Sequence, residues 1–180
     1  MLEKAVENGS SEDCLSWFEA KPGDCVFLSA GAVHAIGAGI VLAEIQQASD
    51  VTYRLYDWNR MGVDGKPRQL HIPQAMDVID FDAGPVAPQV PQPTGQPHVS
   101  QLVACDKFVL NRWRLNAPQS IAGDGRFHIL TVLQGKVAVE GDPANRPLGL
   151  AETIFLPASS PKLQLTPDGD AVLLEARLPD

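Results

Sequence analysis

The chain has 180 residues, of which 44% are hydrophobic and 20% are charged, a balance typical of a folded globular protein with one domain or two small ones. Its formal net charge of −8 argues against a nucleic-acid-binding protein, because such a protein needs a basic face to neutralise phosphates. No apolar run approaches the roughly 20 residues of a membrane-spanning helix. The start, Met1–Lys4, does not resemble a secretory signal, so we expect a cytoplasmic protein without a membrane partner.

The first part of the chain changes from a helical to a strand-like pattern. Residues 1–20 predict one or two short helices, because Leu2, Ala5 and Val6 share a helical spacing before the sequence turns polar. From Lys21 onward, short apolar runs alternate with Gly, Pro and Asp, which favours β-strands. We therefore expect an all-β chain with a helical preface. The predicted strands are 24–29, 40–47, 51–56, 69–72, 107–115, 126–133, 135–140, 153–157, 162–166 and 171–177.

A proline-rich stretch divides the chain. Five prolines fall within thirteen residues between Pro85 and Pro97, and such a segment cannot pair as a central strand. We predict a linker over 85–97. It separates a first unit, 1–84, from a second β unit, 98–180.

The second unit repeats a piece of the first. Residues 151–162 align with 23–34, and Phe-Leu-x-Ala matches in register in the two segments. The repeat predicts two copies of one strand–turn–strand piece. Lys162 stands where the first copy has His34, and because a lysine is a poor ligand beside an imidazole, we expect the second unit to be metal-free.

Two residues of the first unit suit chemistry. His34 follows the small-residue turn Ser29-Ala30-Gly31, and a turn of this kind can hold an imidazole in a defined orientation. Arg54 lies in the β-branched and aromatic run 51–56, where the two-residue period puts it on one face with Thr52 and Tyr56. Its planar guanidinium suits a phosphate or a developing oxyanion.

The order of glycine, strand, tight turn and histidine from Gly23 to His34 is followed by Ser-Asp-Val-Thr-Tyr-Arg at 49–54 and Tyr-Asp-Trp-Asn-Arg at 56–60. Together these motifs resemble the short, type I class of mannose-6-phosphate isomerases, which belong to the cupin superfamily. The resemblance implies two jelly-roll-like cupin units, the first incomplete and the second structural. It also implies the aldose–ketose isomerisation of mannose 6-phosphate and fructose 6-phosphate in carbohydrate metabolism, with Zn²⁺ as cofactor and a sugar phosphate as small-molecule partner.

The resemblance also implies roles for individual residues. His34 matches a zinc ligand of the family, and Arg54 matches the catalytic cation that faces the ene-diolate. Asp50 and Glu44 are substrate-binding carboxylates in one interpretation, and a turn residue and a strand charge in the other. The proton-transferring base is not assigned.

Part of the family's metal site has no counterpart in the sequence. The family takes a further histidine and a glutamate from the first half of its N-terminal cupin, whereas the residues before Lys21 contain no histidine. The resemblance thus covers the C-terminal two-thirds of the family, in a fragment or in a truncated gene product. A half-built barrel leaves strand edges unpaired, through which a homo-oligomer could form. The alternative functions are a catalytically inactive cupin that binds sugar phosphates and a structural remnant.

Overall fold

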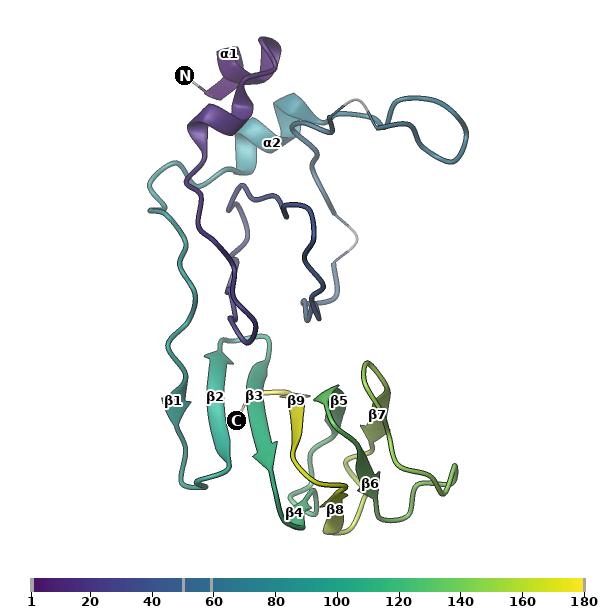
Figure 1. Cartoon of the computed structure of the whole chain (residues 1–180). Helices are drawn as coiled ribbons and strands as arrows, with labels where there is room; N and C mark the ends of the chain where they lie inside the picture. Colours follow the sequence, from purple (N-terminus) through teal and green to yellow (C-terminus); the bar gives the residue numbers. More distant parts are fainter. Residues whose placement is uncertain (1, 50, 59, 180) are drawn as a thin grey trace. The chain divides into compact units, whose positions relative to one another are not determined.

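The computed structural model describes residues 2–49, 51–58 and 60–179 (Figure 1). The chain divides into two compact units, the first reaching Pro88 and the second beginning at Gln89. All helices found in the described ranges lie in the first unit, and all strands lie in the second. None of these helices is long and apolar enough to cross a membrane.

The first unit contains the α-helices α1 (Leu2–Glu7) and α2 (Ile72–Val78) and the 3-10 helix η1 (Ser11–Cys14). The predicted N-terminal helical segment is confirmed by α1, which buries Val6. Helix α2 buries Ala75. Pro73 lies in its first turn, where the absent amide hydrogen would have had no partner within the helix.

The strands predicted in the first unit are wrong. Residues 15–71, positions 50 and 59 aside, consist of turns and extended backbone without a strand, and contain only an isolated bridge between Met61 and Pro67. A strand persists only when a neighbouring strand completes its hydrogen bonds, and the apolar side chains of the predicted strands 24–29 and 40–47 are largely exposed, Val41 completely. The first unit therefore has the sequence pattern of strands, but no neighbouring strand among the described residues pairs with these segments.

The second unit is an antiparallel β structure of two sheets (Figure 1). The six-stranded sheet has the order β1-β2-β3-β9-β5-β7, and the three-stranded sheet has the order β4-β8-β6. The strand bounds are β1 Gln92–Pro93, β2 Val99–Ala104, β3 Val109–Leu115, β4 Gln119–Ile121, β5 His128–Gln134, β6 Val137–Val139, β7 Thr153–Leu156, β8 Leu163–Pro167 and β9 Ala171–Arg177.

The six strands predicted between 107 and 177 are confirmed as β3 and β5–β9. Strands β2 and β4 were not predicted from the pattern. Within the proline-rich stretch, β1 pairs with β2 at the edge of the larger sheet. An edge position tolerates Pro93, because one side of an edge strand needs no amide donor.

The hydrophobic core of the second unit is built by inward-facing side chains of both sheets. Leu130, Val132 and Leu173 are completely buried. On β3, β5 and β9, buried polar side chains lie at one end of the hydrophobic core cluster, next to its members Trp113, Leu130 and Leu173. The polar positions are Asn111, His128 and Glu175, and these three strands are neighbours in the sheet.

Candidate functional site

His34 follows a turn that the local backbone holds firmly. Gly31 has a φ of +86°, and a Cβ at this position would lie 2.7 Å from the carbonyl oxygen of Val78, so only glycine fits. The amide of Asp80 donates to the carbonyl oxygen of Gly31 at 3.2 Å. The His34 side chain is exposed, and its Nδ1 lies 3.0 Å from the carbonyl oxygen of Ala32. If Nδ1 donates this bond, Nε2 is the nitrogen that can face a ligand.

Arg54 is partly buried and is held by backbone and side-chain contacts. Its Nη1 donates to the carbonyl oxygen of Gln69 at 3.3 Å, and its Nε lies 3.8 Å from Oδ1 of Asp57. Two bonds join it to His71: the Arg54 amide donates to Nδ1 at 3.3 Å, and the His71 amide donates to the Arg54 carbonyl oxygen at 2.8 Å. The guanidinium is therefore fixed by its surroundings.

A buried ion pair beside Arg54 was missed in the sequence. Asp57 is 7% exposed, and Arg68 donates from Nε to its Oδ2 at 2.6 Å and from Nη2 to its Oδ1. The hydrogen bond from Arg68 holds the pKa of Asp57 below its ordinary value, against the effect of burial. Asp57 in turn raises the pKa of Arg68. Because Arg68 donates to both carboxylate oxygens of Asp57, it compensates most of the Asp57 charge. Arg54 is therefore paired less firmly with Asp57 than Arg68 is.

The predicted site residues do not line one pocket of the first unit. A pocket of about 390 Å³ is lined by residues that include Asp57, Arg60 and Arg68, but not by His34, Arg54 or Glu44. Glu44 is exposed, and Asp50 lies outside the described residues. The roles given to all four residues stay predictions.

The expected zinc requires a set of donors around His34. A catalytic zinc is usually held by three protein ligands. Within the part of the chain that the structure describes, no group of three or more His, Cys, Asp or Glu side chains is placed to hold a metal ion. His34 thus belongs to no group of three such ligands among the described residues.

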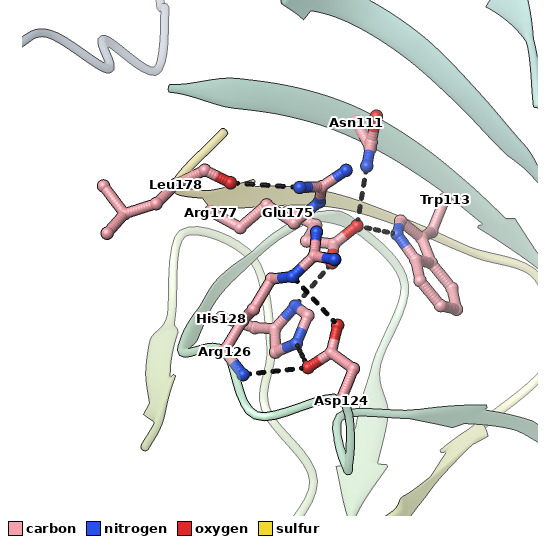
Figure 2. Close-up of polar contacts among 8 residues, drawn as sticks. All are labelled: Asn111, Trp113, Asp124, Arg126, His128, Glu175, Arg177 and Leu178. Carbon is pink, nitrogen blue, oxygen red and sulfur yellow. Dashed lines mark hydrogen bonds and ion pairs between the residues drawn. The ribbon is translucent and has the colours of Figure 1, made fainter. Parts of the chain in front are cut away.

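The buried polar side chains Asn111, His128 and Glu175 form a hydrogen-bonded cluster in the second unit (Figure 2). One oxygen of Glu175 lies 2.6 Å from Nδ1 of His128. The other accepts hydrogen bonds from Asn111 Nδ2 at 3.0 Å and Trp113 Nε1 at 2.7 Å. On the opposite side of the ring, His128 Nε2 lies 3.1 Å from Oδ1 of Asp124. No local motif of the sequence pointed to this cluster.

The electrostatics of the cluster favour an ion pair. Burial alone would raise the pKa of Glu175, but hydrogen bonds from His128, Asn111 and Trp113 outweigh burial and hold that pKa below its ordinary value. The hydrogen bond to Glu175 raises the pKa of His128. Burial lowers this pKa, and the hydrogen bond to Asp124 raises it further. The raised pKa of His128 and the lowered pKa of Glu175 therefore favour a protonated imidazole between two carboxylates.

The second unit matches a known protein family. Residues 98–174 fit the family model described as the cupin domain of mannose-6-phosphate isomerase. This match spans strands β2 to β9 with the exception of the last residues of β9.

Relatives match along most of the chain. The chain is 32% identical over 168 residues to mannose-6-phosphate isomerase ManA of Bacillus subtilis, covering 84% of this chain and 51% of the relative. It is 27% identical over 173 residues to mannose-6-phosphate isomerase of Streptococcus mutans, covering 96% of this chain and 54% of the relative. The chain thus spans about half the length of the curated relatives it matches, less than the two-thirds expected.

Solved structures agree with the sequence relatives. The crystal structure of mannose 6-phosphate isomerase from Bacillus subtilis matches with a TM-score of 0.60 and 25% identity, over 71% of this chain and 40% of that one. A mutant form of phosphomannose isomerase from Salmonella typhimurium matches in fold, with a TM-score of 0.50 and 19% identity over 63% of this chain and 29% of that one. By sequence and by fold, the chain is similar to mannose-6-phosphate isomerases, and residues 98–174 match the model of their cupin domain.

Proposed function

We propose that this chain contributes to the aldose–ketose isomerisation of mannose 6-phosphate and fructose 6-phosphate, with Arg54 as the cation that stabilises negative charge. The observation that carries the proposal is the 32% identity to mannose-6-phosphate isomerase ManA over 84% of the chain. Zinc as the cofactor, a cytoplasmic location and a homo-oligomer belong to the same proposal. The partner is a small sugar phosphate, and neither nucleic acid nor membrane is included.

The reaction requires a fixed positive charge. Isomerisation moves a proton between adjacent carbons through an ene-diolate, so negative charge develops on the substrate oxygens. A guanidinium supplies such a charge, and that of Arg54 is oriented by the Gln69 carbonyl oxygen. Since Arg68 compensates Asp57, the field of Arg54 is available to a substrate anion. Such a preorganised cation lowers the energy of the charged intermediate without rearranging during the reaction.

An activity measurement tests this role. The purified chain, with Zn²⁺ supplied, is assayed for conversion of mannose 6-phosphate to fructose 6-phosphate, and Arg54→Met is compared with Arg60→Met. We expect Arg54→Met to lose activity by about 100-fold, the scale on which one oxyanion-stabilising donor acts, and Arg60→Met to keep it. Equal turnover of wild type and Arg54→Met would refute the role of Arg54.

The absence of a metal-binding group among the described residues favours a second function, a cupin that binds a sugar phosphate without catalysing its isomerisation. Calorimetric titration with fructose 6-phosphate separates the two. Binding without turnover, with Zn²⁺ present and absent, supports the binding protein. Neither binding nor turnover supports a purely structural role.

A further inference from the structure

The second unit contains a pocket that the proposed isomerase function does not use. Its volume is about 970 Å³, at the upper end of the range for small-molecule sites. The pocket lies at the polar end of the core, where Asn111, His128 and Glu175 line it. Trp113 and Ile121 contribute apolar surface to the same wall. A mixed apolar and polar lining of this kind is typical of sites for small ligands.

The pocket lining contains three cationic side chains and two carboxylates, and Nε of Arg126 lies 4.0 Å from Oδ2 of Asp124. Arg126, Lys162 and Arg177 line the pocket together with the carboxylates of Asp124 and Glu175. Both oxygens of Glu175 already accept bonds from buried side chains, so its charge is compensated within the protein wall. In a chain with a net charge of −8, a pocket with three cations indicates an anionic ligand.

The fold brings these cations together from separate elements. Arg177 stands two residues after Glu175 on β9, so it points to the same face of the sheet. Arg126 lies two residues before His128, which begins β5. Figure 2 shows the side chains of both arginines beside the Glu175–His128 pair. Lys162 immediately precedes β8.

The loop that carries Asp124 and Arg126 is shaped by unusual backbone angles. Ala122 has a φ of +62°, and Gly123 and Gly125 have φ values of +76° and +78°. A Cβ on Gly123 would lie 2.7 Å from the backbone nitrogen of Lys162. Glycine is therefore required for the loop to lie against the Lys162 backbone, which places two of the three cations at one side of the pocket.

The pocket lining also contains uncharged polar residues, which a site for a simple anion would not need. Gln101, Gln119 and Ser120 also line the pocket, and amide and hydroxyl side chains can donate and accept hydrogen bonds. Oδ1 of Asn111 is buried without a hydrogen-bond partner in the described part of the chain, which is rare for a buried amide oxygen. A ligand with hydroxyl groups would use these donors and acceptors, whereas a simple inorganic anion would not.

We propose that this pocket of the second cupin unit binds a small hydroxylated anion, namely a sugar phosphate or a sugar carboxylate. Arg126, Lys162 and Arg177 hold the anionic group, and the amide and hydroxyl side chains hold the ligand hydroxyls. Glu175 and His128 form the rigid floor and take no part in a reaction. The site is separate from Arg54 and does not rest on the isomerase proposal.

The 180-residue chain tests the proposal through the Trp113 indole N–H, which donates to Glu175 at 2.7 Å and reports on the pocket in a ¹⁵N–¹H NMR spectrum. The probes are fructose 6-phosphate, gluconate, inorganic phosphate and mannose. We expect fructose 6-phosphate or gluconate to shift the Trp113 signal saturably. The affinity of that probe should exceed those of inorganic phosphate and mannose by about tenfold, which corresponds to about 1.4 kcal/mol.

Matched variants assign the binding to the pocket. Arg126→Met and Arg177→Met should each weaken binding by about tenfold or more, the scale of one charge-assisted contact. Arg146→Met serves as the control, because Arg146 is an exposed arginine of the same unit that pairs with Glu152 outside the pocket lining. This variant should bind as wild type. Retained NMR spectra of the two pocket variants establish that they are folded.

Several results would overturn the proposal. The first is the absence of a saturable shift with both hydroxylated anions. The second is unchanged affinity in both pocket variants. The third is an affinity for inorganic phosphate that equals or exceeds the affinities for both fructose 6-phosphate and gluconate. Arg54→Met separates this site from the proposed isomerase site. Trp113 shifts that persist in Arg54→Met support the pocket even if isomerase activity is absent, whereas shifts abolished only in Arg54→Met place the binding in the first unit and overturn the pocket.

Discussion

At the scale of single residues, the second unit buries two ionisable side chains, Glu175 and His128. Glu175 and His128 are each 3% exposed, and an uncompensated charge at such a depth would be strongly unfavourable. The contacts that offset this cost come from three strands, β3, β5 and β9. The same contacts hold the polar end of the core in one arrangement, which gives the neighbouring pocket a defined shape.

Removing the buried carboxylate charge should destabilise the second unit. In Glu175→Gln the protonated His128 loses its closest counter-charge, and breaking a buried pair in this way costs about 3 kcal/mol or more. Urea unfolding followed by the Trp113 indole NMR signal measures the loss. Glu152→Gln is the control, because Glu152 forms an exposed pair with Arg146, and its loss should be much smaller. Equal stability of the two variants would contradict the importance of the buried pair.

The pKa shifts of the cluster predict how stability depends on pH. His128 has a raised pKa in the folded state, so its contribution is fully present below its unfolded value of 6.5 and is lost as pH rises through the raised pKa. Glu175 has a lowered pKa, so its contribution is present above its unfolded value of 4.5 and is lost as pH falls through the lowered pKa.

The free energy of unfolding of the second unit should therefore decline as the pH rises from 6.5 through the raised His128 pKa. Urea unfolding curves recorded at a series of pH values measure it. His128→Gln has no titrating ring at this position, and its stability should change less over the same range. A wild-type profile as flat as that of His128→Gln would show that the imidazole is not charged in the folded state.

At the scale of elements, the apolar pattern predicts strands correctly only where a partner exists. Strand β3 pairs on one side with β2 and on the other with β9, so its alternating residues enter a common core. The segments 24–29 and 40–47 have a similar pattern but find no ladder among the described residues. Helix α2 was missed because seven residues beginning beside Pro73 are too few to establish a helical period.

The turn between β5 and β6 offers a test of element packing. Gly135 has a φ of +73°, and a Cβ there would lie 2.3 Å from the carbonyl oxygen of Asp170. Gly141 has a φ of +76°, but a Cβ there would meet no atom within 4 Å. Gly141→Ala should lose about 1 kcal/mol for the left-handed backbone alone, and Gly135→Ala about 1–3 kcal/mol more for the clash.

The urea midpoints of the two alanine variants measure this difference. Both positions carry a left-handed glycine, so the comparison isolates the contact with Asp170. Equal losses would mean that the backbone at Asp170 moves aside at little cost.

At the scale of the whole molecule, the two units differ in how much apolar surface they bury. The hydrophobic core cluster lies entirely in the second unit, whereas the buried hydrophobic residues of the first unit are Val6 and Ala75 among the residues described. Since burial of apolar surface is the main driving force of folding, the second unit carries most of the stability of the chain.

A polypeptide of residues 89–180 should consequently fold alone. We expect cooperative urea unfolding with a midpoint close to that of the full chain and an unchanged Trp113 indole signal. A polypeptide of residues 1–88 is the comparison, and it should unfold without a sharp transition. Loss of cooperative unfolding in 89–180 would show that the second unit depends on the first.

The sequence by itself determined six strands of the second unit, β3 and β5–β9, and the similarity to mannose-6-phosphate isomerases, because a two-residue period and a motif such as that at 49–54 are local patterns. Only the tertiary structure decided which polar groups meet. Glu175 lies 64 residues from Asn111 and 47 from His128, and Asp57 lies 11 residues from Arg68 across a loop. Contacts at these separations depend on strand register and loop path, which no local spacing encodes.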